Sequence, residues 1–298
     1  MKLGYPCVNN SIGCTPNRTF RLKSYSPERL IETVEENMRC LKETLQFNLD
    51  YGFLFFRIGS QLVPFASHPV CTFDWQGHFR DQFAEVGDWI KKHDMRISMH
   101  PDQFVLLNAL DEKIVKNSIA ELEYHCQVLD LLGLSRTAKV QIHVGGVYGD
   151  RDAAKERFVA VCRQLPDFVR ARLAIENDDH RFDLADCLEV HEQTGMPVIF
   201  DSFHHECRNR GESMADALTL AAQTWSAEDG LPMTDYSSQK QDGRTGSHTY
   251  HIDAGHFRAY LRDTKDINFD LMLEIKDKEI SAMQALEVAR EERTDLVY

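Results

Sequence analysis

The sequence predicts an α/β fold, a single (β/α)8 TIM barrel. Apolar runs of strand length alternate with helical patterns along the chain, which is the order that parallel strands require. Eight strand candidates in 298 residues match the size of such a barrel. A doubly wound open sheet is the competing architecture. Its dinucleotide-binding version has less support, because no Gly-x-Gly-x-x-Gly motif follows the first strand.

The strand candidates are short apolar runs that stop at polar residues. In chain order they cover residues 2–5, 54–58, 96–100, 139–143, 172–176, 197–201, a poorer candidate near 231–237, and 271–275. The segment 229–246 reads as a long loop at the seventh strand, because polar residues and glycines dominate it.

The helical patterns fill the intervals between the strands. The first follows Ser26 and Pro27, a capping residue with proline at the first helical position. Its apolar residues share one helical face and are Leu30, Val34, Met38, Leu41 and Leu45. The other expected helices cover 78–92, 113–132, 152–165, 183–194, 213–225 and 279–292. Gly133 and Gly195 end two of them.

Composition indicates a soluble protein with one domain over residues 1–298. Hydrophobic residues make up 43% of the chain, and no apolar stretch approaches the roughly 18 residues that a membrane span needs. We therefore expect a cytoplasmic protein, and we expect it to be a monomer. The eight cysteines contain no Cys-x-x-Cys pair, so we expect reduced and mostly buried thiols.

The charge balance argues against a broad, non-specific polyanion binder. The 47 Asp and Glu residues outnumber the 34 Lys and Arg residues, which gives a formal charge of −13. Bound cations would weaken this objection to nucleic acid, because the local field steers a ligand and the total charge does not.

Metal-capable side chains stand at the ends of five strand candidates. They are His100, His143, Glu176, Asp201 and, one residue before the end of its run, Glu274. The carboxyl ends of barrel strands meet at one face, where active sites lie. Three carboxylates at close range repel one another in a low-dielectric site, and divalent cations remove that cost. The pattern therefore predicts a metal centre.

The mixture of imidazoles and carboxylates suits Mn²⁺, Fe²⁺ or Zn²⁺. His204 and His248 are plausible further ligands, and His205, His251 and His256 lie nearby in the sequence. Seven ligands exceed what one tetrahedral ion uses, so we infer a multinuclear site. Two ions bridged by carboxylates suit phosphodiester hydrolysis, in which the ions activate water and stabilise the leaving oxygen.

Seven short motifs resemble the UV damage endonuclease family. They are GYPCVNN (4–10), SMHPDQFVLLN (98–108), QIHVGG (141–146), AIENDD (174–179), FDSFHH (200–205), DYSSQ (235–239) and MLEIKDKE (272–279). The resemblance implies a TIM barrel related to endonuclease IV that nicks damaged duplex DNA immediately 5′ of pyrimidine dimers. It also implies a Mn²⁺-containing cluster and products with a 3′-hydroxyl and a 5′-phosphate.

Matched motif by motif, the resemblance implies roles for individual residues. Metal ligands would be His100, His143, Glu176, Asp201, His204, His248 and Glu274. The carboxylates Glu176, Asp201 and Glu274 would be the catalytic residues that set the geometry. Mn²⁺ is the expected metal, with Zn²⁺, Mg²⁺ or Fe²⁺ as alternatives. No protein nucleophile is required.

The chain departs from the family pattern in the seventh strand. Family members carry Lys-x-His-Tyr-Ser there, with the lysine modified near the metals, and this chain has Met233 and Asp235 at the lysine and histidine positions. Met233 cannot replace that lysine. Asp235 can coordinate a hard cation in place of histidine, so it joins the expected ligands.

The resemblance also assigns lesion recognition to two segments. Gln103 and Phe104 match a Gln-Tyr pair that is wedged into the duplex at the lesion, and Tyr5 and Asn9 match residues near the metal site and the damaged strand. An aromatic ring between bases replaces lost stacking, and a photodimer is easier to extrude than intact bases.

Basic residues in the loops are candidate phosphate contacts. They are Arg18, Arg21 and Lys23 near Asn17, and Arg208, Arg210, Lys240, Arg244 and Lys276. Two alternatives stay open at this point. One is a metal-dependent sugar isomerase or epimerase on the same barrel, and the other is a metal-binding sensor of DNA damage that does not cut.

Overall fold

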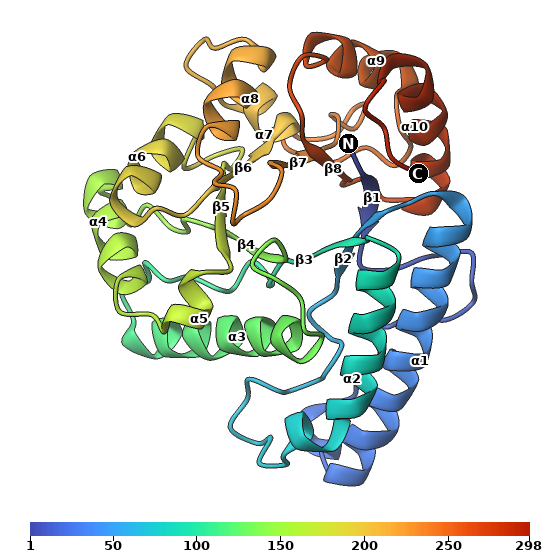
Figure 1. Cartoon of the computed structure of the whole chain (residues 1–298). Helices are drawn as coiled ribbons and strands as arrows, with labels where there is room; N and C mark the ends of the chain where they lie inside the picture. Colours follow the sequence, from blue (N-terminus) through green and yellow to red (C-terminus); the bar gives the residue numbers. More distant parts are fainter.

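Eight short strands form a closed parallel barrel in a computed structural model that describes all 298 residues (Figure 1). The strands lie in sequence order, and β8 pairs with β1 to close the barrel. Their bounds are β1 Leu3–Pro6, β2 Phe55–Ile58, β3 Arg96–Met99, β4 Lys139–His143, β5 Leu173–Glu176, β6 Val198–Asp201, β7 Met233–Tyr236 and β8 Asp270–Leu273. The predicted (β/α)8 barrel is confirmed.

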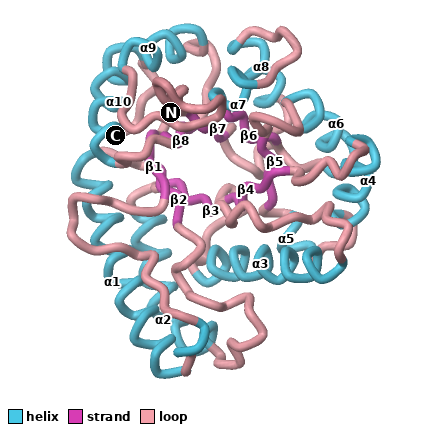
Figure 2. The backbone as a smooth tube through the Cα atoms, turned by 180° about the vertical axis from the view of Figure 1, so that it is seen from behind, coloured by secondary structure: helices cyan, strands magenta, loops and turns pink.

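Helices form the outer layer around the strands, as the view from behind shows (Figure 2). Their bounds are α1 Pro27–Tyr51, α2 Trp75–Lys92, α3 Glu112–Leu131, α4 Arg151–Cys162, α5 Asp167–Arg170, α6 Leu184–Thr194, α7 Ser202–Cys207, α8 Met214–Ala222, α9 Ala254–Asp263 and α10 Glu279–Glu292. A short 3₁₀ turn covers Leu22–Ser24. No helix is both long enough and apolar enough to span a membrane.

The seven predicted long helices are present with small shifts at their ends. N-terminal capping residues explain why the starts of α1 and α6 were predicted correctly. Ser26 accepts a hydrogen bond from the Arg29 amide, and Asp183 forms a capping box at the start of α6. Gly195 ends α6 in the left-handed conformation at φ 72°. The sequence analysis missed the short helices α5 and α7, and it also missed α9.

The barrel interior contains an apolar layer and, above it, a charged layer. The apolar layer consists of Phe55, Ala174, Ile199, Met233 and Met272, and it forms a cluster separate from the larger core that joins strands to helices. Side chains two positions apart on a strand point to the same side. The next inward residues on the same five strands are therefore charged, and they are Arg57, Glu176, Asp201, Asp235 and Glu274. The period of the strands thus places the charged layer at their carboxyl ends.

One pair of cysteines contradicts the expectation of reduced thiols. Cys14, in the loop after β1, and Cys40, on α1, form a disulfide with their Cα atoms 5.9 Å apart. The other six cysteines are free, and Cys126, Cys162 and Cys187 are buried as expected. The sequence separation of 26 residues gave no motif that would have indicated the pairing.

Candidate metal centre

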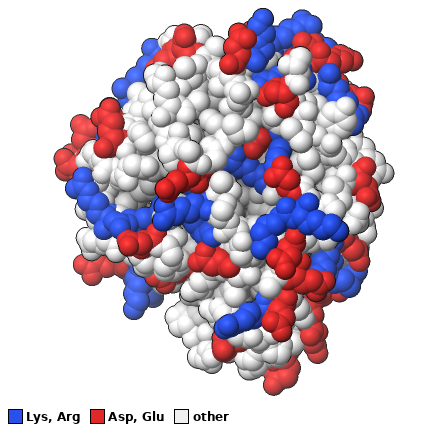
Figure 3. Space-filling model, in the orientation of Figure 1, with Lys and Arg blue, Asp and Glu red and all other residues white.

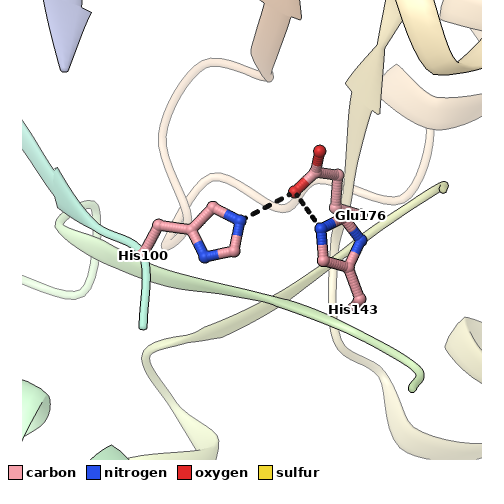
Figure 4. A group of neighbouring side chains, drawn as sticks. All are labelled: His100, His143 and Glu176. Atoms are coloured by element: carbon pink, nitrogen blue, oxygen red, sulfur yellow. Dashed lines mark ion pairs between the residues drawn. The ribbon is translucent and has the colours of Figure 1, made fainter. Parts of the chain in front are cut away.

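Glu176 lies at the centre of the charged layer, at the end of β5. Its Oε2 atom is 3.2 Å from Nε2 of His100, which follows β3, and 3.5 Å from Nε2 of His143, which ends β4. His143 and Glu176 are register partners on adjacent strands, so the ladder itself brings them together. Both imidazoles point toward the same carboxylate oxygen (Figure 4). This arrangement is a three-residue group that can hold an ion.

The second oxygen of Glu176 faces a second group. Its Oε1 atom is 3.2 Å from Nδ1 of His204, and Asp201 Oδ2 is 3.5 Å from the same nitrogen. Asp201 ends β6 and caps α7 by accepting a hydrogen bond from the His204 amide at 2.7 Å. The cap places both side chains beside Glu176. Because Glu176 faces both groups, its carboxylate can join two ion positions.

Three of the predicted histidine ligands are oriented by backbone carbonyls. The Nδ1 atoms of His100, His204 and His248 each lie 2.9 Å from a carbonyl oxygen, those of Pro101, Asn177 and Glu274 respectively. A carbonyl only accepts, so each of these nitrogens donates when the ring is neutral and leaves Nε2 free to bind a metal. In His204 the donating Nδ1 is also the nitrogen that faces Glu176 and Asp201. In that tautomer the Nε2 lone pair of His100 faces the Glu176 carboxylate, and a cation between them would satisfy both.

Burial and neighbouring charges shift the pKa values of both buried carboxyls. Burial disfavours the charge of Glu176, but His143, His100 and His204 outweigh it and hold its pKa well below the usual range. Burial raises the pKa of Asp201 to about 8, and the carboxylates of Glu176 and Glu274 act in the same direction. A cation bound beside Asp201 would therefore stabilise the ionised form of its carboxyl group.

One buried polar atom at the site fits a metal ion. Asp201 Oδ2 is buried without a hydrogen-bond partner; His143 Nδ1 is also unpartnered, but the nitrogen of His143 that faces Glu176 is Nε2. An unsatisfied buried carboxylate oxygen is costly, and coordination to a cation removes that cost. Together with the imidazoles, this donor set suits a borderline or hard divalent ion.

The third possible ion-binding group consists of Asp201, Asp235 and Glu274. Here the structure adds two residues that the sequence analysis missed. The Arg57 guanidinium contacts both Asp235 and Glu274, and the Gln141 amide donates to Asp235 and Glu176 at 2.5 Å. Burial disfavours the charge of Glu274, but Arg57 lowers its pKa to about 2. His248 Nδ1 lies 3.9 Å from Glu274 Oε2, at the partly exposed rim.

The residues after Glu176 hold the neighbouring strand and loop. Asn177 accepts from the Asp201 amide at 2.9 Å and donates to the Asp201 carbonyl at 3.0 Å. The Asp178 carboxylate accepts from the amides of His180, Arg181 and Phe182. These contacts fix the position of Asp201 relative to Glu176.

The other three nearby histidines are not brought into the site. His205 Nε2 lies 3.2 Å from the Glu212 carbonyl, His251 pairs with Asp277, and His256 lies between Glu206 and the Tyr236 hydroxyl. Each has a partner outside the metal-binding groups.

The two predicted wedge residues stand in solvent beside the site. Phe104 is 72% exposed, so it is not a core aromatic, and Gln103 is exposed next to it. Gln103 lines two hollows of about 310 and 450 Å³, which share His100 and His143. The loop that carries Gln103 therefore stands between two openings over the predicted ligands.

Tyr5 and Asn9 lie beneath the surface. Both are buried, the Tyr5 hydroxyl donates to Asn48 at 2.5 Å, and Asn9 donates to that hydroxyl at 2.7 Å. The Asn9 side chain also accepts from the Ser11 amide. In this structure neither side chain offers a surface to DNA, and both support the loop that follows β1.

The predicted phosphate contacts fall into two sets. Arg18, Arg208 and Arg210 pair with carboxylates. Arg21, Lys23, Lys240, Arg244 and Lys276 form no ion pair and remain available to an anion. On the face in Figure 3, Lys and Arg form a broken band across the middle, interspersed with acidic residues. The overall negative charge therefore does not leave this face without basic groups.

Comparisons with known proteins distinguish the UV damage endonuclease family from the sugar isomerase or epimerase alternative. The family model described as UV-endonuclease UvdE matches residues 1–295. The chain belongs to the UV-endonuclease UvdE family. A UV DNA damage endonuclease of Clostridium perfringens is 36% identical over 98% of this chain and 71% of the relative. The crystal structure of SacUVDE matches with a TM-score of 0.94 and 43% identity, over 98% of each chain. Membership in this family makes the chain an enzyme, a nuclease of DNA repair.

Sugar epimerases share the barrel at lower similarity. D-psicose 3-epimerase from Clostridium cellulolyticum H10 matches with a TM-score of 0.57 and 15% identity, over 85% of this chain and 93% of the epimerase. A likeness at this level shows the fold alone. It does not support the sugar isomerase or epimerase alternative, whereas the UvdE family match covers nearly the whole chain.

Proposed function

We propose that this UvdE-family chain nicks damaged duplex DNA immediately 5′ of pyrimidine dimers and leaves a 3′-hydroxyl and a 5′-phosphate. The observation that carries the proposal is the pair of groups around Glu176 at the carboxyl face of the barrel. Two neighbouring groups of imidazoles and carboxylates can hold the two divalent ions that phosphodiester hydrolysis of this kind requires. The relatives named UV DNA damage endonuclease supply the substrate class.

The proposed ligands divide between the two groups and the rim. His100, His143 and Glu176 would hold one ion, and Glu176, Asp201 and His204 would hold another. His248 and Glu274 would complete the site from its partly exposed side. When bound, divalent ions supply a hydroxide nucleophile at neutral pH and neutralise charge on the phosphate. We expect Mn²⁺, because it accepts both imidazole and carboxylate.

The protein's own groups would position the DNA. Gln103 and Phe104 are exposed above the ligands and can enter the duplex at a distorted step, where stacking on the ring offsets the lost base stacking. Free basic groups such as Lys276 would contact phosphates and set the register of the duplex. One chain suffices for this arrangement, because every proposed ligand lies on it, and we therefore propose a monomer.

Removing the metal should abolish activity on UV-irradiated supercoiled plasmid. We expect chelator-treated protein to leave the plasmid supercoiled and added Mn²⁺ to restore relaxation, because the ligands alone supply no nucleophile. The measurement is the fraction of relaxed circles with time. An unirradiated plasmid is the control and should stay intact. Full activity in the stripped protein would contradict the proposal. Binding of the irradiated plasmid without relaxation would favour the sensor alternative.

A further inference from the structure

Arg57 is a buried cation inside the metal centre. It lies on β2, two residues after Phe55 of the apolar layer, and is 2% exposed. Its position in the barrel interior follows from the strand period. Burying a guanidinium is costly unless the surrounding groups pair with it, so the residues that Arg57 contacts indicate its role.

The two terminal nitrogens of Arg57 make specific contacts, whereas its Nε atom is buried without a hydrogen-bond partner. Its Nη2 atom donates to both oxygens of Asp235, at 2.8 and 2.7 Å, and to Gln141 Oε1 at 2.8 Å. Its Nη1 atom donates to Glu274. Burial disfavours the charge of Arg57, but Asp235 and Glu274 outweigh it and raise its pKa.

Asp235 is therefore already occupied by protein donors. Its Oδ2 atom accepts from Gln141 Nε2 at 2.5 Å as well as from Arg57, and its Oδ1 atom accepts from Arg57. The register partner of Asp235 on β6 is Asp201, whose Oδ2 atom has no hydrogen-bond partner and lies 3.5 Å from His204 Nδ1. Asp201 therefore has an oxygen that is available to a metal ion, whereas both oxygens of Asp235 already accept hydrogen bonds from protein groups.

We propose that Arg57 serves as a protein-supplied cation that keeps Asp235 out of metal coordination, so that the barrel binds two divalent ions and not three. The inference rests on the proposed metal centre and revises the expected role of Asp235. The two ions would occupy the groups that share Glu176, and Arg57 would take the place of an ion between Asp235 and Glu274.

The charge balance of the layer supports two ions. Glu176, Asp201, Asp235 and Glu274 carry four negative charges when ionised, and Arg57 cancels one of them. Two divalent ions would leave one positive charge to attract a phosphate. A third ion would raise the net charge of the layer, with Arg57 included, to three positive charges, and like charges at this range repel strongly.

The test is the number of Mn²⁺ ions bound per chain, measured by native mass spectrometry and by elemental analysis of equilibrated protein. We expect two ions in the wild type and two in Asp235→Asn. We expect Asp201→Asn, the matched change on the adjacent strand, to lose one. In Arg57→Met, Asp235 and Glu274 lose their cation, and we expect a third ion to bind. Arg96→Met removes a buried Arg–Asp pair at the opposite end of the barrel and should retain two ions.

The outcomes separate this inference from the proposed function. Three ions in the wild type, or loss of an ion in Asp235→Asn, would overturn the role of Arg57 and leave the metal-dependent endonuclease intact. A count that stays at two in Arg57→Met would also overturn it. If Arg57→Met does not fold, Asp235→Asn still decides the question. A wild-type protein that binds no ions would overturn the proposed function and this inference together.

Discussion

Replacing Glu176 by glutamine should lower the rate of Mn²⁺-dependent nicking by about 10³-fold or more, which corresponds to ~4 kcal/mol of transition-state stabilisation. Glutamine keeps the volume of the side chain and removes the charge. The loss is expected to be large because the two oxygens of Glu176 face different groups, with His100 and His143 on one side and His204 on the other. One substitution therefore weakens both proposed ion positions.

The measurement is the initial rate at several Mn²⁺ concentrations with a duplex that contains one cyclobutane dimer. Asp270→Asn is the control, because Asp270 is a buried carboxylate at the opposite end of the barrel, paired with Arg96. We expect that control to lower stability but to leave the rate of the folded enzyme unchanged. A Glu176→Gln enzyme that retains more than a tenth of the wild-type rate would show that Glu176 does not join the ions.

Replacing Phe104 by alanine should lower the rate on a dimer-containing duplex by about 5–150-fold, because one base–aromatic stack is worth ~1–3 kcal/mol. Phe104 is 72% exposed, so its removal leaves no cavity, and we expect stability and the number of bound ions to be unchanged. Phe104→Tyr keeps the stacking surface and should retain most of the activity.

The control for this loss is another exposed phenylalanine. Phe168 is 40% exposed on α5, which leads into the opposite end of β5, and Phe168→Ala should not affect nicking. Both variants are compared by single-turnover rates on the same duplex. Wild-type rates in Phe104→Ala would rule out stacking by this ring at the lesion.

The strand pattern allowed the barrel and the position of the site to be predicted from the sequence. Parallel strands align their carboxyl ends, so residues such as Glu176 and Asp201, each at the end of an apolar run, had to meet at one face. The closed barrel then places Glu274 near them, because β8 pairs with β7. Local period and topology were sufficient for these residues.

The partners of Arg57 could not be predicted in the same way. Arg57 interrupts an apolar run on β2, while Asp235 and Glu274 lie 178 and 217 residues further along the chain. Which charged groups pair across a barrel depends on the depth of each residue in the interior, and the sequence does not report that depth. The same reason explains why Gln141 passed for an ordinary strand residue. The pairing of Cys14 with Cys40 was missed because two cysteines 26 residues apart match no motif.

Burial also separated two lesion-recognition candidates that the motifs treated alike. Phe104 and Tyr5 are both aromatic residues in matching motifs, yet Phe104 stands in solvent and Tyr5 is fully buried against Asn48. A motif fixes residue identity, and exposure depends on how the loop after each strand folds back on the barrel. Phe104 therefore stays the proposed direct contact, whereas Tyr5 supports the loop that follows β1.

The most direct test of the account is the position of the nick on an end-labelled duplex with one cyclobutane dimer, mapped at single-nucleotide resolution with Mn²⁺ present. We expect one cut immediately 5′ of the dimer, with a 3′-hydroxyl that a polymerase extends, and no cut in the undamaged duplex. Cuts at many positions, cuts at equal rates in both duplexes, or a blocked 3′ end would contradict the proposed function.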